Sequence, residues 1–535
     1  MRHAWVRLVI VSVLLVTAPF SSSFANEVPL SQVRHVLDRI AFGPRPGDIA
    51  QVQQMGLDAY IEQQLSPETI PLPKSLTDRL AAMSQNDMTQ ADLIKNWRRV
   101  AVAAVRDTSG GGPGTPIAVR NAYYKAMTVH FGELRLVQAI DSPRQLNEVM
   151  VNFWFNHFNV VNNKRVTRVL IGDYERQAIR PYVLGKFRDM LGAVTKHPAM
   201  LFYLDNWVSS APGAEVYIPG TKRRVSGINE NFARELMELH TLGVNGGYTQ
   251  ADVTTLARIL TGWTFTPRGS DPRATFMFAP QMHDDGAKVW LGQTVSVTGQ
   301  AQGEWALDVL ARHPATARYI SFKLAQYFVS DDPPQALVDR MAHQFLATDG
   351  DIREVMRVLL KSAEFRSPEA MQAKFKTPYE YVISAVRARG GEVNNTRPLL
   401  LAMSRMGMPL HRCGSPDGYK NTQATWLSPG AIAQRIEFAT GLALGRMRLS
   451  AFPKRLDPEG AGSKVLAMMP ATLTPASIDQ TLGSVAAQDD PVAAARLTAV
   501  LGEQSEIGVQ VALADQNRLG LGAALILGSP TFMRR

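Results

Sequence analysis

The feature that most constrains this chain is the spacing of its apolar residues, which recur at intervals of three and four along most of the sequence. This spacing places apolar side chains on one face of an α-helix, whereas a half-buried strand would need strict alternation. Proline, glycine and helix-capping residues interrupt the pattern repeatedly. The sequence therefore predicts a mainly all-α protein, built as a large multi-helical domain.

Signals for β-strands are sparse. The best candidates are two short runs at residues 274–278 and 288–291, separated by a polar turn at residues 283–286. We expect them to form a small β-hairpin insertion near residues 274–291. No loop is long or biased enough to force a domain boundary, so we expect a single domain over residues 26–535. A C-terminal subdomain from about residue 446 is the alternative.

The first 25 residues have the composition of a secretory signal peptide. Arg2 and Arg7 precede an apolar run of about 13 residues, which is short against the roughly 20 needed to span a bilayer. Ser23 and Ala25 are small residues at the two positions that a signal peptidase reads. We expect cleavage after Ala25, with an uncleaved anchor as the alternative. The mature protein would then be periplasmic or secreted, without a transmembrane span.

The expected mature chain stays basic, since removal of Arg2 and Arg7 lowers the formal net charge from +10 to +8. The basic residues are scattered and no recognition motif accompanies them, so we expect no nucleic-acid ligand. A solvated basic surface is the simplest interpretation, and an anionic polymer remains open as a ligand. Because Cys413 is the one cysteine, no internal disulfide can form and core burial must hold the protein together.

Familiar catalytic motifs are missing from the sequence. It contains no Gly-x-x-x-x-Gly-Lys-Ser/Thr, no His-Glu-x-x-His, no Cys-x-x-Cys and no Gly-x-Ser-x-Gly. The common nucleotide-binding, metalloprotease, zinc and serine-hydrolase templates are therefore absent. Any chemistry must use a less familiar arrangement of side chains.

One unusual stretch, residues 152–159, places amides and a histidine among aromatic residues. On a helix, Asn152, Asn156 and Asn159 share one face, and His157 has aromatic neighbours. Buried amides need hydrogen-bond partners, so this stripe either faces a ligand or ties the helix to its neighbours. We treat Asn152, Asn156 and His157 as candidate binding residues.

The residue pair Asp205 and Asn206 follows an apolar run that starts at His197. It falls in an expected loop, and loops carry binding residues disproportionately. We add both residues to the candidate binding set.

The densest polar stretch covers residues 229–243. On a helix, Asn231, Glu235 and Glu238 stack on one face, Arg234 lies beside Glu238, and His240 lies near the glycine that ends the helix. Adjacent carboxylates acquire split pKa values that suit acid–base chemistry, or they ligate a divalent cation. The structural alternative is an Arg234–Glu238 ion pair on a packed helix.

We assign catalytic roles to Glu235, Glu238 and His240, an anion contact to Arg234, and a binding role to Asn231. Di-iron bundles require a glutamate followed three residues later by a histidine, and this stretch does not offer that spacing. A divalent metal therefore remains an unassigned cofactor.

Several stretches resemble a bacterial family known as domain-of-unknown-function family 1800. The matching residues are 37–44, 152–159, 197–206, 229–252, 260–263, 313–318 and 525–535. The resemblance implies an exported, helical protein whose activity is unassigned. It also implies a partner, since members are often encoded beside a second exported family that resembles sulfatases and phosphatases.

Three functions are compatible with these patterns, and the sequence leaves open whether the protein is an enzyme. The leading hypothesis is a periplasmic or secreted enzyme that acts on an envelope or extracellular polymer. The second is a non-catalytic partner or scaffold of an exported hydrolase. The third is a haem or metal oxidoreductase.

Overall fold

The structure is a computed structural model that describes residues 28–83, 88–107, 112, 114–214, 216–217, 224–225, 227–265, 276–450 and 519–535. The expected signal peptide and most of the expected C-terminal subdomain lie outside these residues. The described part is mainly α-helical, which confirms the predicted fold class.

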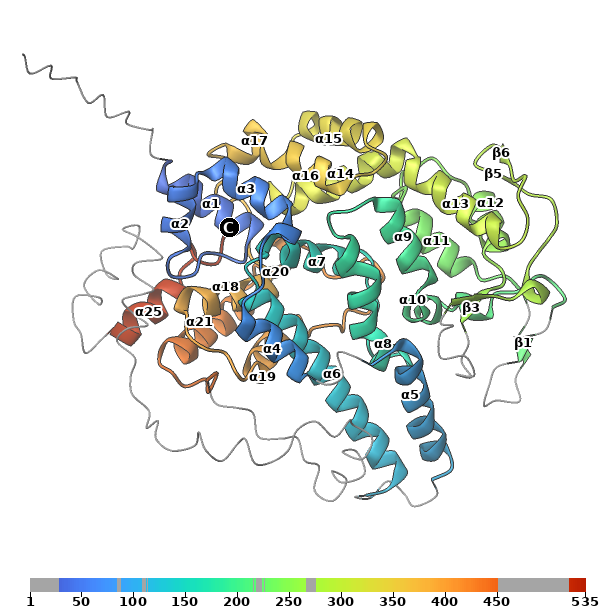
Figure 1. Cartoon of the computed structure of the whole chain (residues 1–535), viewed down its shortest axis with the longest axis horizontal. Coiled ribbons are helices and arrows are strands. Elements are labelled where there is room, and N and C mark those ends of the chain that lie inside the picture. The colour runs from blue at the N-terminus through green and yellow to red at the C-terminus, as the bar shows by residue number, and fades with distance from the viewer. Residues whose placement is uncertain are drawn as a thin grey trace, which may run out of the picture.

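The first helices of the chain pack beside its last ones, at the left of Figure 1. These elements are α1 (Leu30–Ile40), α2 (Asp48–Met55), α3 (Leu57–Leu65), α4 (Lys74–Ala82), α17 (Ala363–Arg366), α18 (Pro378–Arg389), α19 (Arg397–Arg405), α20 (Gln423–Trp426), α21 (Pro429–Ala443) and α25 (Leu519–Leu527). Nε2 of His35 in α1 hydrogen-bonds to the carbonyl oxygen of Phe365 in α17 at 2.7 Å. Both ends of the chain therefore contribute to one packed region.

The middle of the molecule is built from α5 (Gln90–Val105), α6 (Pro116–Asp141), α7 (Gln145–His157), α8 (Thr167–Tyr174), α9 (Phe187–Lys196) and α10 (Pro198–Tyr203). The long helix α6 runs downward in Figure 1 and pairs with α5, so the two project from the body. A π-helical turn, Glu175–Ile179, directly follows α8. The sequence pattern predicts a helix from residue 182, but α9 begins at Phe187 because this turn and a 3-10 turn at Arg180–Tyr182 come first.

The remaining helices form the upper and right-hand parts of Figure 1. They are α11 (Glu230–Glu238), α12 (Gln250–Ile259), α13 (Gln300–Arg312), α14 (Pro314–Phe328), α15 (Gln335–Ala347) and α16 (Ile352–Leu360). Thr249 and Asp252 form a reciprocal capping box at the start of α12, which satisfies backbone groups that a helix end leaves open. His313 caps α14 through Nδ1, which accepts a hydrogen bond from the N–H of Ala315 at 3.1 Å.

The described strands are short and pair locally. They are β1 (Val216–Tyr217) with β2 (Arg224–Val225), β3 (Trp263–Phe265) with β4 (Phe276–Phe278), and β5 (Val289–Trp290) with β6 (Gln293–Thr294), all antiparallel. Strands thus form within both predicted runs, but they pair with other segments and not with each other. Leu291 and Gly292 both have positive φ and form the tight turn that returns β5 onto β6.

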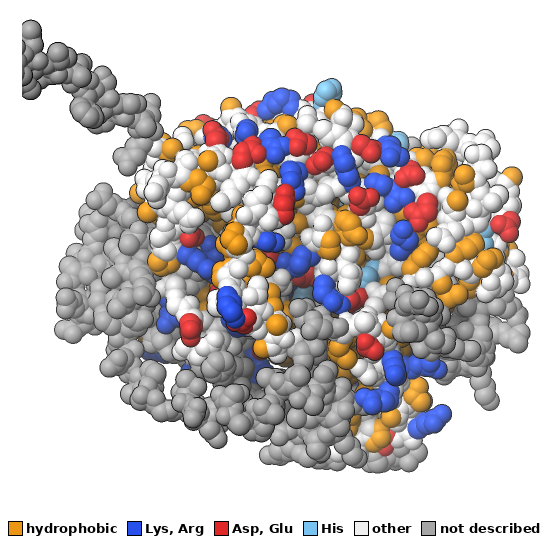
Figure 2. Space-filling view, viewed as in Figure 1, with side chains coloured by type: hydrophobic (Ala, Val, Ile, Leu, Met, Phe, Trp, Pro, Cys, Tyr) orange, Lys and Arg blue, Asp and Glu red, His pale blue; other side chains and the backbone are white. Residues whose placement is uncertain are grey.

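The buried apolar side chains form one continuous cluster that includes Trp154, Trp263 and Trp290. The surface in Figure 2 shows basic and acidic side chains interspersed across its upper part. Ion pairs of the described residues include Arg353–Glu68 and Arg340–Glu364. Positive and negative side chains are therefore paired in part.

Candidate functional site

The two polar stretches singled out in the sequence meet where α7 and α11 end. Nε2 of His157 donates a hydrogen bond to the carbonyl oxygen of His240 at 3.1 Å, and the two imidazole rings lie 6.1 Å apart. Both histidines are buried, and burial lowers the pKa of His157 well below its usual value and that of His240 to about 4. Both rings are therefore neutral at physiological pH.

The amide stripe of α7 holds a loop, residues 413–419, against these helices. Asn159 Nδ2 donates to the carbonyl oxygens of Cys413 and Ser415, at 3.0 and 2.7 Å. Asn156 holds the other end of the loop through two hydrogen bonds with the backbone of Tyr419. Asn156 and Asn159 therefore share this loop as their partner, and both amides bind backbone groups within the protein.

The loop brings Asp417 within electrostatic range of Glu235 on α11. Glu235, Glu238 and Asp417, here called the carboxylate cluster, are all half-buried. Burial raises the pKa of Glu235, and repulsion from Glu238 and Asp417 raises it further. Burial acts in the same direction on Asp417, but hydrogen bonds from Lys420 and Ser415 outweigh it and lower its pKa. Two neighbouring carboxyl groups are thus shifted in opposite directions.

Three other side chains border the carboxylate cluster. The hydroxyl of Tyr203, at the end of α10, donates to the carbonyl oxygen of Gly414 at 2.8 Å. Burial, together with repulsion from Asp417 and Glu238, raises the pKa of Tyr319 to about 12. Burial lowers the pKa of Lys323 despite the attraction of Asp417. Two phenols and an amine therefore lie within electrostatic range of the cluster, and the hydroxyl of Tyr203 is already used to hold the loop.

Glu238, Arg234 and Asn231 of α11 also lie at the edge of the predicted site, and Asn231 is the most exposed of the three. Glu238 accepts a hydrogen bond from the hydroxyl of Tyr248 at 3.4 Å. Arg234 pairs with Glu230 at 3.4 Å and donates to Gln250 at 2.9 Å, so its partners differ from the expected Glu238. Asn231 is exposed in the first turn of the helix.

The other predicted binding residues lie in separate surroundings. Asn152 is buried and bridges Arg135 and the hydroxyl of Tyr327, at 2.9 and 3.2 Å. Asn206 is fully buried and donates to the carbonyl oxygens of two residues beyond α12. Asp205 is exposed and pairs with Lys164 at 2.7 Å. The structure does not bring these three residues into the carboxylate cluster.

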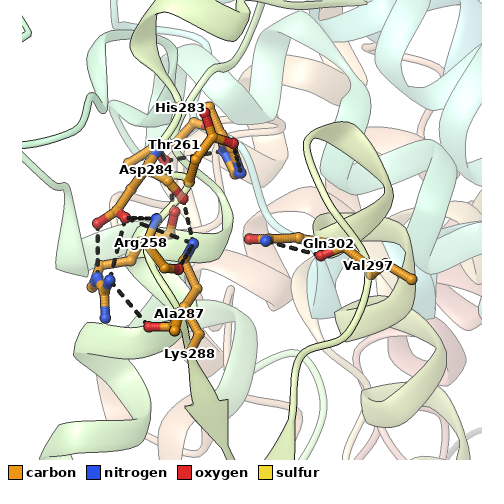
Figure 3. A network of polar contacts seen from close by, with 10 residues as sticks. Arg258, Thr261, His283, Asp284, Ala287, Lys288, Val297 and Gln302 are labelled. Carbon is orange, nitrogen blue, oxygen red and sulfur yellow. Dashed lines mark hydrogen bonds and ion pairs between the residues drawn. The ribbon is translucent and has the colours of Figure 1, made fainter.

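The polar turn at residues 283–286 forms a structural network. Arg258 Nε donates to the Asp284 carboxylate at 2.7 Å, and the backbone N–H of Asp284 donates to the hydroxyl of Thr261 at 2.9 Å (Figure 3). His283 Nδ1 donates to the carbonyl oxygen of Thr261 at 2.9 Å. These contacts fasten the turn to the end of α12, while the strands on either side of it pair with other segments.

The sequence indicates a loop around Asp417 that could close over a site, but not where that loop lies. It assigns no role to Tyr203 or Lys323. The available signal for the loop's position was the amide stripe, because buried amides need hydrogen-bond partners.

No group of three or more His, Cys, Asp or Glu side chains is placed to hold a metal ion within the described ranges. The carboxylate cluster therefore offers no ready-made metal site, and we derive no chemistry through a metal. Among the helices that the structure describes, none has the length and apolarity needed to cross a membrane.

Fold and site together define a mainly helical protein in which a loop clamped by α7 completes a half-buried carboxylate cluster on α11. The chain belongs to the family described as "Protein of unknown function (DUF1800)", whose model matches residues 35–534. Comparisons with curated proteins and with solved structures each found no match.

Proposed function

We propose that this protein is an exported enzyme, periplasmic or secreted, that cleaves an envelope or extracellular polymer by acid–base chemistry at the carboxylate cluster. One observation carries the proposal: Glu235 has a raised pKa beside Asp417, whose pKa is lowered. Titratable groups whose surroundings separate their pKa values identify an acid and a base.

The proposed reaction is hydrolysis, with each proton accounted for. Glu235 donates its proton to the leaving oxygen of the polymer linkage as that bond breaks. The carboxylate of Asp417 accepts a proton from the attacking water, whose oxygen forms the new bond. Proton exchange with solvent then restores both groups, and Glu238 supplies the neighbouring negative charge that helps keep Glu235 protonated.

The other predicted residues take supporting roles in this proposal. Arg234, half-exposed beside the cluster, contacts anionic groups of the polymer, and the exposed Asn231 extends that contact. His157 and His240 are positioning residues because they are buried and neutral, and join the ends of α7 and α11. Asn156 positions Asp417 through the loop.

The test is complementation of a strain that lacks the protein, with Glu235→Gln, Glu238→Gln and Asp417→Asn variants. Glu437→Gln is the matched control, since Glu437 is an exposed carboxylate on α21. The proposal predicts that the folded Glu235 and Asp417 variants fail to restore the phenotype while the control succeeds. Full rescue by both the Glu235 and the Asp417 variants would exclude acid–base catalysis at this site.

A second function, a non-catalytic partner of a co-encoded exported sulfatase- or phosphatase-like protein, is supported by a different observation. The side-chain amides of three predicted binding residues form hydrogen bonds within the protein; these residues are Asn152, Asn156 and Asn206. In that case the Glu235 variant would lose melting temperature, and affinity purification would recover a stoichiometric exported partner.

A further inference from the structure

A second polar site lies away from the carboxylate cluster. A cavity of about 230 Å³ opens between α6, the end of α8 and the residue His411. Phe131 and Leu134 of α6 form its apolar wall. Gln138, Glu175, Arg180 and His411 supply polar groups around it. The cavity therefore combines an apolar face with several hydrogen-bonding side chains.

Two backbone irregularities lie in the wall of this cavity. The π-helical turn begins at Glu175, and such turns occur frequently at functional sites. His411 has a φ of 61°, a left-handed conformation that costs on the order of 1–3 kcal/mol for a residue with a side chain. Gly172 allows the Phe131 ring to lie against α8, where a Cβ atom would overlap the ring. A left-handed residue and a π-helical turn at one cavity are features that functional sites often share.

The charges around the cavity balance. Glu175 pairs with Arg135 at 3.3 Å and with Arg180 at 2.8 Å. Arg180 also pairs with Glu148 at 2.6 Å. At the rim, Arg176 is neutralised by Asp173 at 2.7 Å.

Three arginines therefore face three carboxylates, and burial lowers the pKa of His411, which keeps that ring neutral. A charged ligand would enter this site without a counter-charge, and an unpaired buried charge is strongly unfavourable. An uncharged ligand avoids that penalty.

We propose that this cavity binds a single uncharged, hydroxyl-rich ring of monosaccharide size. Hydroxyl groups both donate and accept hydrogen bonds, so they match the side-chain oxygen atoms of Gln138 and Glu175 and the guanidinium of Arg180. Nε2 of Gln138 donates to the carbonyl oxygen of Leu134 at 3.3 Å. The C–H face of such a ring matches the wall formed by Phe131 and Leu134. The volume is below the roughly 300–1,000 Å³ of sites for drug-sized ligands, which limits the occupant to one ring. This inference does not rest on the proposed function.

The test is titration calorimetry of the full chain with glucose, galactose and N-acetylglucosamine, and with glucuronate and glucosamine as charged analogues. We expect at least one neutral sugar to bind, and its charged analogue to bind at least about tenfold more weakly. Gln138→Leu, at a half-buried position, should weaken binding by a similar factor. Gln177→Leu is the control, because Gln177 is exposed in the π-helical turn and does not line the cavity.

Three results would overturn the proposal. The first is that no neutral sugar binds at about 50 mM, and the second is that charged and neutral sugars bind equally well. The third is that the folded Gln138 variant binds as wild type does, because the loss of one hydrogen bond should cost a measurable free energy of about 1 kcal/mol. Glu235→Gln should leave sugar binding intact, so this outcome is separate from the test of the carboxylate cluster.

Discussion

The side-chain amide of Asn156 exchanges two hydrogen bonds with the backbone of Tyr419: Nδ2 donates to the carbonyl oxygen at 2.6 Å, and Oδ1 accepts from the N–H at 2.8 Å. This contact joins positions 263 residues apart in the chain. It fixes the loop that carries Asp417 against the end of α7. The geometry of the carboxylate cluster therefore depends on an amide that belongs to a different helix.

Gly418 makes this close contact possible, and its replacement should break it. Its φ is +70°, and a Cβ atom there would overlap the backbone and side chain of Asn156. We expect Gly418→Ala to lower the free energy of unfolding by about 1–3 kcal/mol, measured by urea denaturation. Gly414→Ala is the control, since a Cβ at Gly414 meets nothing within 4 Å. Equal stability of the two variants would show that the loop is not clamped.

The amide stripe could be predicted from the sequence only in part. Helical spacing predicts one shared face for Asn152, Asn156 and Asn159, and the need of amides for partners predicts either a ligand or a neighbouring segment there. Spacing within a helix carries no information on which distant segment supplies those partners. The sequence therefore indicates only that the loop around Asp417 could close over a site, whereas Glu235 and Glu238 are candidates because they share a face of their own helix.

Buried histidines should make stability fall in mild acid. Burial lowers the pKa of His35 and His240 to about 4, from a reference value of 6.5. Their neutral forms stabilise the folded state fully above pH 6.5, and this contribution is lost as the pH falls towards 4 because the unfolded chain binds the protons. Between pH 7.5 and 5.5, each should cost about 1.4 kcal/mol.

Urea denaturation at the two pH values measures this loss. His35→Gln should reduce the pH dependence, whereas His343→Gln should not, since His343 is exposed. Stability that stays constant or rises on acidification would contradict the neutral state of these rings.

The side chain of Arg535 should be essential to stability. It is buried, pairs with Glu380 at 2.8 Å and donates to the carbonyl oxygen of Tyr327 at 3.1 Å. Arg535→Ala would leave Glu380 buried without this partner, which should cost about 3–5 kcal/mol. The neighbouring Arg534→Ala is the control, because Arg534 makes one long hydrogen bond at an exposed position. A melting temperature equal to that of the control would show that this ion pair does not support the core.

The spacing of apolar residues predicts the helical fold class, but it does not predict which charged side chains are buried as pairs in the interior. Arg135 lies four residues after Phe131 and four before Ala139, on the same face of a helix, and it is buried with Glu175. A charged residue on an apolar face is a visible signal, yet its partner 40 positions away depends on how α6 packs against the turn after α8. The two predicted strand runs do contain strands, but their partners, β3 and β6, could not be read from local alternation.

The most direct test of this account is the free energy of unfolding of Glu235→Gln relative to wild type at pH 7.5. Burial and repulsion disfavour the ionised form of Glu235, so the neutral variant should be as stable as wild type or more stable, by up to about 1 kcal/mol. Because the folded pKa is raised, this difference should vanish as the pH falls to the reference value of 4.5. A stable variant that loses biological activity is the predicted result; a destabilised variant that keeps its activity would contradict the account.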